Sequence, residues 1–296
     1  MNKATPWVGV LGAVGLGALL ALAGSDSGGR LAGIPVFALC VALAFAIQWL
    51  AFVPAYLAQS ERYFDLTGSF TFLSLALFAL AVSEQPDART VIIALLVACW
   101  AVRLGWFLSA RIRRDGFDRR LNRIKKDFAV FLMTWSLQGA WVTVSFAPGL
   151  AAITTSSRVP ADGFLAAGAV LWALGFAIEV AADEQKRRFR SQAANAERFI
   201  ASGLWAWCRH PNYFGEILLW TGIAVAAWPA LQGWALLTLA SPLFIVLLLT
   251  RISGVRMLQA SGQRRWGDDP EYRDYLARTP ALIPRPPRRP RPKPSA

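Results

Sequence analysis

The sequence contains few of the residues that build metal centres and disulfide frameworks. Its 296 residues include one histidine, His210, and three cysteines, Cys40, Cys99 and Cys208, which are scattered and lie mostly in or near apolar runs. A lone histidine argues against a histidine-based metal site, and such cysteines suggest neither a disulfide framework nor a thiolate metal site. The G-x-S-x-G motif of serine hydrolases is also absent, so a Ser-His-Asp hydrolase is poorly supported. We therefore expect no metal in the site.

Charged residues are scarce as well. Only 17% of the residues are charged and 55% are hydrophobic, whereas a soluble domain carries about 25% charged residues. The apolar residues form runs of roughly 20, the length of a membrane-spanning helix, and the first of these is expected to be retained rather than cleaved. The sequence therefore predicts an all-α polytopic membrane bundle of seven to eight spans. Candidate spans lie at roughly 6–23, 34–57, 69–83, 90–110, 128–152, 163–182, 213–229 and 232–250, of which the third and seventh are short.

Basic residues outnumber acidic ones, and the net charge is +13. With eight spans, 27 of the 31 Lys and Arg residues fall on the side that also receives both termini, and three, Arg30, Arg89 and Arg158, fall on the other side. Because cytoplasmic loops carry the excess of Lys and Arg, this asymmetry predicts that both termini are cytoplasmic. The charge therefore requires no nucleic-acid partner. We expect the basic loops and a disordered polybasic tail, residues 284–296, to contact anionic lipid headgroups.

A polar and basic stretch between apolar segments, residues 183–216, carries the clearest functional signal. Asp183 and Arg190 are seven residues apart, so both can face one side of a continuing helix. Arg198 is expected in a second short helix. Pro211 in a first helical turn leaves free backbone N–H groups and a positive dipole end, which suit an anion. The stretch is therefore predicted to form half of a site for a large anionic cofactor on the inner face of the membrane.

Ionisable residues also lie within or at the ends of the predicted spans, where each costs roughly 2.5–3.5 kcal/mol at a helix centre. They are Arg103, Glu179 and Glu216. Each alone has a structural explanation, such as snorkelling or ion pairing, but together with the polar stretch they favour a polar cavity that opens inward. His210 is open to two interpretations in the same way, because a lone histidine beside arginines can also cap a helix or form a local hydrogen bond.

Three segments, SGLWAWCRHPNYFGEILLW, TRISGVRMLQ and EYRDYLARTPALIPR, resemble the steroid 5-alpha-reductase family, and most closely its bacterial branch. The resemblance covers roughly residues 60–283 and is strongest from Asp183 onward. The core RHP-x-Y alone is shared with isoprenylcysteine carboxyl methyltransferases and some sterol reductases, whereas the longer run is more specific. The resemblance implies one transmembrane domain over residues 1–283 in a bacterial inner membrane. About 1–110 would enclose the substrate, and about 111–283 would bind NADPH on the cytoplasmic side.

The resemblance also implies roles for individual residues. Trp100 stands where the animal enzymes have a tyrosine that helps to polarise the substrate ketone, and tryptophan donates an N–H but cannot act as an acid. Their substrate-binding glutamate has no secure counterpart. The proton donor is therefore open between Tyr63, Asp65 and Tyr213, with Gln48 as an outside candidate, and Gln48 and Trp100 are candidates for substrate contact. The candidates for binding NADPH are Asp183, Arg190, Arg198, His210, Asn212, Glu216 and Trp220, together with Arg103, Arg114 and Arg251 at basic positions of the same family.

These observations predict an NADPH-dependent reductase of a carbon–carbon double bond conjugated to a ketone, in a lipid or steroid that enters from the bilayer. One alternative is an S-adenosylmethionine-dependent methyltransferase of the isoprenylcysteine type. Against it, Arg251-Ile252-Ser253-Gly254 stands where that family typically has a Glu-Glu pair, and its cofactor is not polyanionic. The other alternative is a non-catalytic membrane scaffold or lipid-binding protein, in which Asp183→Ala, Asn212→Ala and Glu216→Ala would change only stability. The oligomeric state is not predicted.

Overall fold

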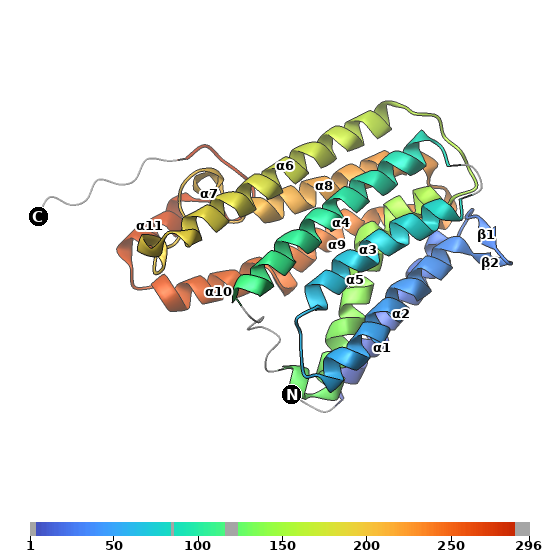
Figure 1. Ribbon diagram of the computed structural model, residues 1–296. Coiled ribbons are helices and arrows are strands. Elements are labelled where there is room, and N and C mark those ends of the chain that lie inside the picture. Colours follow the sequence, from blue (N-terminus) through green and yellow to red (C-terminus); the bar gives the residue numbers. More distant parts are fainter. Residues whose placement is uncertain (1–3, 84–85, 116–123, 288–296) are drawn as a thin grey trace, which may run out of the picture. The chain divides into compact units, whose positions relative to one another are not determined.

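The computed structural model describes residues 4–83, 86–115 and 124–287, with the backbone alone for 111–115. Regular structure in these residues is helical apart from one short antiparallel hairpin, β1 (Arg30–Leu31) and β2 (Ile34–Pro35), which confirms the all-α prediction (Figure 1). The chain divides into two compact units. The first contains residues 1–169 and 223–241, and the second contains 170–222 and 242–296. Most of the tail that was predicted to be disordered, from residue 288 onward, lies outside the described residues.

The first unit is built around α5 (Phe128–Thr154). From Val142 to Thr154 every residue of α5 is buried, as expected for a helix surrounded by other helices. It contacts each of the four preceding helices and a later 3-10 helix, η4. The other elements of this unit are α1 (Thr5–Gly24), α2 (Val36–Leu57), α3 (Phe64–Ala81), α4 (Ala88–Asp115), η1 (Ile124–Lys126), η3 (Trp228–Ala230) and η4 (Gly233–Ala240).

Arg89, at the start of α4, joins three parts of the first unit. Its side chain is 1% exposed. One guanidinium nitrogen lies 2.8 Å from the Asp162 carboxylate and donates to the carbonyl of Pro160 at 3.1 Å, and the other donates to the carbonyl of Ala226. Buried charges are tolerated when they are paired and hydrogen-bonded in this way. Arg89 therefore has a structural role, which accounts for one of the few basic residues on the sparsely charged side.

The second unit contains the C-terminal part of α6 (Gly163–Ser191) and most of α8 (Pro211–Ala227). As predicted, α6 continues without a break past Asp183 and Arg190, and α8 begins at Pro211. These two helices carry half of the residues predicted to bind a cofactor. The remaining elements are η2 (Ala193–Asn195), α7 (Leu204–Trp207), α9 (Ser241–Leu247), the π-helix η5 (Leu248–Ile252), α10 (Val255–Trp266) and α11 (Pro270–Arg278).

The prediction that Arg198 lies in a short helix is wrong. The 3-10 helix η2 ends at Asn195, and residues 198–201 have no regular secondary structure. The neighbouring side chain of Phe199 packs between aromatic rings of α10 and α11, with ring centroids 5.0 Å from Tyr272 and 6.0 Å from Trp266. This tertiary contact overrides the helix propensity of the alanine-rich sequence.

Within the described residues, seven segments are long and apolar enough to cross a membrane. This confirms the predicted range of seven to eight spans and makes the chain an integral membrane protein. The predicted span 213–229 forms α8, which is not among the seven because it has only 17 residues, the lower limit for a spanning helix. The third span begins at Phe64 rather than at 69, and the last belongs to a longer run, Gly233–Trp266, that contains 3-10, α and π turns.

Candidate functional site

Two glycines bring α6 and α8 of the second unit into backbone contact. A Cβ atom on Gly215 would lie 2.6 Å from the carbonyl oxygen of Gly175, and one on Gly175 would lie 2.5 Å from that of Gly215. This close approach places the buried Asp183 of α6 beside the first turn of α8, where the Asn212 amide donates to its carboxylate at 3.3 Å. Two residues predicted from the sequence to share a site are thus in contact, and their role in cofactor binding stays a prediction.

The turn into α7 places an aromatic ring at the end of α6. Gly203 has a φ of +60°, and a Cβ atom there would lie 2.6 Å from the side-chain oxygen of Gln185, which accepts a hydrogen bond from the Leu204 backbone N–H at 2.9 Å. Only glycine adopts this backbone conformation readily. The turn lets the Trp205 indole N–H donate to the Ala182 carbonyl at 3.1 Å, with the Lys186 ammonium 4.5 Å from the ring centroid. Trp205 thereby forms one wall of a cleft.

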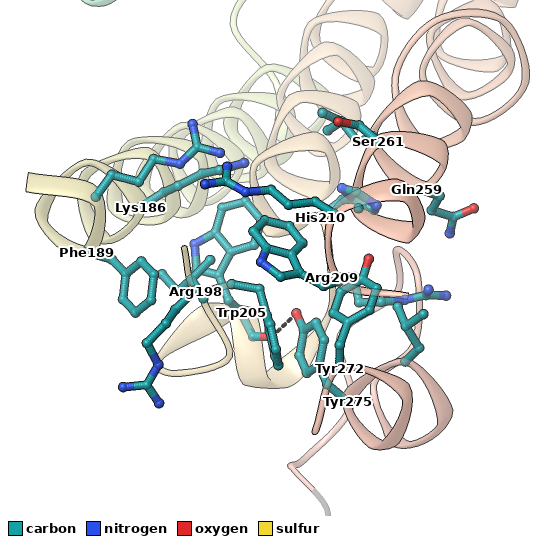
Figure 2. A pocket seen from close by; sticks show the side chains of 18 residues that line it. Lys186, Phe189, Arg198, Trp205, Arg209, His210, Gln259, Ser261, Tyr272 and Tyr275 are labelled. Atoms are coloured by element: carbon teal, nitrogen blue, oxygen red, sulfur yellow. Dashed lines mark hydrogen bonds between the residues drawn. The ribbon is translucent and has the colours of Figure 1, made fainter. Parts of the chain in front are cut away.

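The cleft has a volume of about 160 Å³ and lies between α6, α7, α10 and α11 (Figure 2). Five cationic residues line it: Lys186, Arg190, Arg198, Arg209 and Arg265. Six aromatic residues complete its walls: Phe189, Phe199, Trp205, Trp266, Tyr272 and Tyr275. None of the described residues that line it is acidic. Guanidinium groups pair with phosphates, and aromatic walls accept planar rings, so the cleft is suited to a phosphate-bearing ligand with an aromatic ring.

His210 lies in this cleft, buried at 6% exposure. Its ring stacks on that of Tyr213, with centroids 5.5 Å apart, and neither ring nitrogen has a hydrogen-bond partner among the described residues. The imidazole therefore does not form the local hydrogen bond that sequence alone left open. A buried polar group without a partner is rare in native proteins and commonly marks a position that a ligand or water completes. The Nε of the adjacent Arg209 is buried and lacks a partner in the same part of the structure.

The environment of His210 favours its neutral form. Burial, reinforced by the positive charges of Lys186 and Arg209, lowers the pKa of His210 to about 3. A neutral imidazole offers one donor and one acceptor to a ligand at neutral pH. The tyrosines opposite also stay protonated, because burial raises the pKa of Tyr275, whose hydroxyl donates to the Trp205 carbonyl at 2.8 Å (Figure 2).

We predict that His210 makes stability depend on pH below neutrality. Its folded-state pKa of about 3 lies below the ordinary value of about 6.5, so the unfolded chain binds the proton more readily. The corresponding stability is fully present above about pH 6.5 and is lost as the pH falls toward 3. Thermal unfolding midpoints in detergent should therefore fall more steeply between about pH 6.5 and 4 in the wild type than in His210→Gln. Equal slopes in the two proteins would show that the histidine titrates normally.

The structure divides the predicted cofactor residues of the second unit into three groups. Arg190, Arg198 and His210 line the cleft. Asp183 and Asn212 form the adjacent contact between α6 and α8. The others do not line the cleft: Glu216 and the buried Trp220 belong to α8, and the exposed Arg251 belongs to the π-helix. Tyr213 lies in the first turn of α8, where a Cβ atom on Gly254 would be 2.8 Å from its ring.

The remaining candidates belong to the first unit. Tyr63 precedes α3 and is 61% exposed, and Asp65 lies in the first turn of that helix. Gln48 is fully buried, and its amide donates to the Thr71 hydroxyl at 2.8 Å, while its oxygen has no hydrogen-bond partner among the described residues. Trp100 is 1% exposed.

Two basic candidates lie farther along α4. The Arg103 guanidinium lies 5.0 Å from the centroid of the Phe107 ring. Arg114 lies in the last turn of the helix, where its side chain falls outside the described residues.

Several cleft residues were not found from the sequence. Lys186 was not singled out in the polar stretch, and Arg209 was noted there but not included among the cofactor-binding candidates, although each is one to four residues from a predicted site residue. Arg265, Trp266 and Tyr272 come from α10 and α11, far along the chain. A usable signal was the spacing of Tyr272 and Tyr275, which places both rings on one face of a helix that follows the last span.

Fold and site together define a helical membrane protein with a cationic, aromatic-walled cleft. The chain matches the family described as "Protein of unknown function (DUF1295)" over residues 51–279 and belongs to that family. It is similar to the 3-oxo-5-alpha-steroid 4-dehydrogenases 1 of Rattus norvegicus (32% identity, 40% of each chain) and Bos taurus (35% identity, 23% of this chain and 26% of the relative). These alignments span well under half the length of the curated relatives. No solved structure matches the chain.

Proposed function

We propose that the protein is an NADPH-dependent membrane reductase that acts on a carbon–carbon double bond conjugated to a ketone in a lipid or steroid. The observation that carries the proposal is the cleft: five cations, aromatic walls and an unpartnered neutral histidine, in a chain similar to enzymes named 3-oxo-5-alpha-steroid 4-dehydrogenase 1. The residues fit the cofactor, because NADPH carries a diphosphate, a 2′-phosphate and planar rings. We further propose that the cleft faces the cytoplasm of a bacterial inner membrane, because most basic residues lie on that side.

The cleft alone does not enclose the whole cofactor. Its volume of about 160 Å³ is below the roughly 300–1,000 Å³ of typical ligand sites, so it suits one end of a dinucleotide. Arg190 and Arg198 would hold phosphate oxygens, and His210 would complete the hydrogen bonds to that end. The Asp183–Asn212 pair would contact the part that extends along α8. We expect this division of binding to fix the cofactor's orientation.

When bound, NADPH supplies the hydride. The chain's own work is to exclude water, orient the ketone and deliver a proton to the α-carbon. Tyr63, Asp65 and Tyr213 are the proposed sources of that proton, and Gln48 and Trp100 the proposed substrate contacts. Trp100 can donate a hydrogen bond through its indole N–H, so it can orient a carbonyl but cannot give up the proton.

The decisive experiment is nucleotide binding by the purified protein in detergent. NADPH, NADH and S-adenosylmethionine are compared by thermal shift and, for the reduced nucleotides, by fluorescence. The proposal expects NADPH to bind and Arg198→Ala to weaken that binding. The matched control is Arg264→Ala, because Arg264 is an exposed arginine of the second unit that does not line the cleft. Screening enones for NADPH oxidation then identifies the substrate.

Two other outcomes would replace the proposal. Stabilisation by S-adenosylmethionine and not by NADPH would favour a methyltransferase. The core Arg209-His210-Pro211-Asn212-Tyr213, taken alone, is compatible with that function. A folded protein that responds to none of the three ligands, and whose Asp183→Ala and Asn212→Ala variants differ from it only in stability, would favour a scaffold or lipid-binding protein.

A further inference from the structure

The backbone beside Arg198 is held by the end of α10. The Arg265 guanidinium donates to the Ala196 carbonyl at 2.6 Å and lies 3.0 Å from the Glu197 carboxylate, and the Trp266 indole N–H donates to the Glu197 carbonyl at 2.6 Å. Two consecutive residues thus bind two consecutive carbonyl groups. We call residues 196–200 the Arg198 segment.

The Arg198 segment has little local structure of its own. Its backbone makes two local turn hydrogen bonds, in which the Ala196 N–H donates to the Ala193 carbonyl and the Arg198 N–H donates to the Asn195 carbonyl, each at 3.1 Å, and residues 198–200 are neither helix nor strand. Its anchor is Phe199, whose ring lies 6.0, 5.0 and 5.4 Å from the rings of Trp266, Tyr272 and Tyr275. The position of Arg198 at the cleft therefore depends on α10 and α11 rather than on its own sequence.

Removing these contacts should cost little stability. The Arg265–Glu197 pair is exposed, with side chains 45% and 85% accessible, and exposed ion pairs contribute about 0–1 kcal/mol. Loss of the ion pair should change the charge near the cleft more than it changes the stability of the fold. Without Arg265, the Glu197 carboxylate next to Arg198 would lose its partner and would compete with an anionic ligand for that guanidinium. Geometry and charge at the cleft can thus change while the fold is kept.

We infer that Arg265 and Trp266 are positioning residues that set Arg198 for a nucleotide phosphate and so determine preference for NADPH over NADH. The inference rests on the proposed function. A cleft of about 160 Å³ with aromatic walls suits a purine ring, and the guanidinium at its edge would meet a phosphate on the attached ribose. NADH lacks that 2′-phosphate, so loss of the correct Arg198 position should weaken the binding of NADPH and not of NADH.

The test compares dissociation constants for NADPH and NADH in three variants. Trp266→Phe removes the indole N–H but keeps a ring in the aromatic cluster, and Arg265→Gln removes the guanidinium. Arg264→Gln is the control, because it removes the same charge from the neighbouring, exposed position outside the cleft. We expect about three- to tenfold weaker NADPH binding in Trp266→Phe and Arg265→Gln, with NADH binding and the Arg264→Gln variant within about twofold of wild type.

The outcomes separate this inference from the proposed function. A wild type that binds neither nucleotide rejects the proposed function itself. A wild type that binds NADPH, with Arg265→Gln indistinguishable from Arg264→Gln, overturns the positioning role. Equal loss of NADPH and NADH affinity also overturns it, because that result would indicate general damage to the cleft. If Trp266→Phe fails to fold, Arg265→Gln can still overturn the positioning role by matching Arg264→Gln, since its ion pair is exposed and its loss should not unfold the protein.

Discussion

Gly215→Ala is expected to separate α8 from α6 and to abolish tight nucleotide binding. The added Cβ would lie 2.6 Å from the Gly175 carbonyl oxygen and 2.7 Å from the Glu179 backbone nitrogen, and backbone atoms cannot move aside as a flexible side chain can. Overpacking of this kind costs about 1–3 kcal/mol. The displacement should also break the hydrogen bond from Asn212 to Asp183, so affinity for the nucleotide should fall by at least about tenfold.

Thermal unfolding and nucleotide titration of the same preparation check this prediction. Gly163→Ala is the matched control, because Gly163 is also on α6 and a Cβ atom there would meet nothing within 4 Å. Gly175→Ala should reproduce the Gly215→Ala result from the other helix. A Gly215→Ala protein that melts and binds like the wild type would mean that the two helices are not held in backbone contact.

Arg89→Met should destabilise the first unit more than any other arginine substitution on its sparsely charged side. The substitution leaves the carbonyl groups of Pro160 and Ala226 without their donor, and each unsatisfied buried carbonyl costs about 1–3 kcal/mol. We expect the free energy of unfolding to fall by on the order of 2 kcal/mol or more, which should lower the midpoint of thermal unfolding by several degrees.

The control for Arg89→Met is Arg30→Gln. Arg30 is exposed, and its guanidinium donates to the carbonyl of Gly33, so its loss should leave the midpoint nearly unchanged. If both variants melt at the same temperature, the buried contacts of Arg89 contribute no more than a surface arginine does. Nucleotide binding at low temperature should survive in Arg89→Met, because its contacts belong to the first unit.

The sequence predicted the membrane helices well because apolar runs of about 20 residues have few other uses. It also assigned Asp183 and Asn212 to one site, where the structure shows them in contact, and it predicted the helix that starts at Pro211. It placed Arg198 in a helix because local propensity favours one there, whereas Phe199 is bound by rings from α10 and α11. Propensity carries no information about such distant contacts.

The same limit explains why the cleft residues of α10 and α11 were not predicted from the sequence. Arg265 and Trp266 contact residues about seventy positions earlier in the chain, and nothing in the local pattern of α10 distinguishes Arg265 from its neighbour Arg264. Lys186 was likewise one basic residue among several on α6. In a sequence with this many arginines, only the three-dimensional arrangement shows which of them face a cavity.

The two compact units are interleaved along the chain, and this affects both proteolysis and folding during translation. The chain leaves the first unit after residue 169 and returns to it for residues 223–241. There the Trp234 backbone N–H donates to the Asp26 carboxylate at 2.7 Å, and the Ser241 hydroxyl donates to the Ser145 carbonyl at 2.8 Å. No single cleavage can release either unit intact. During translation, α1 and α5 can complete their contacts only after residues 223–241 have been made. By then most of residues 170–222, the first part of the second unit, has left the ribosome.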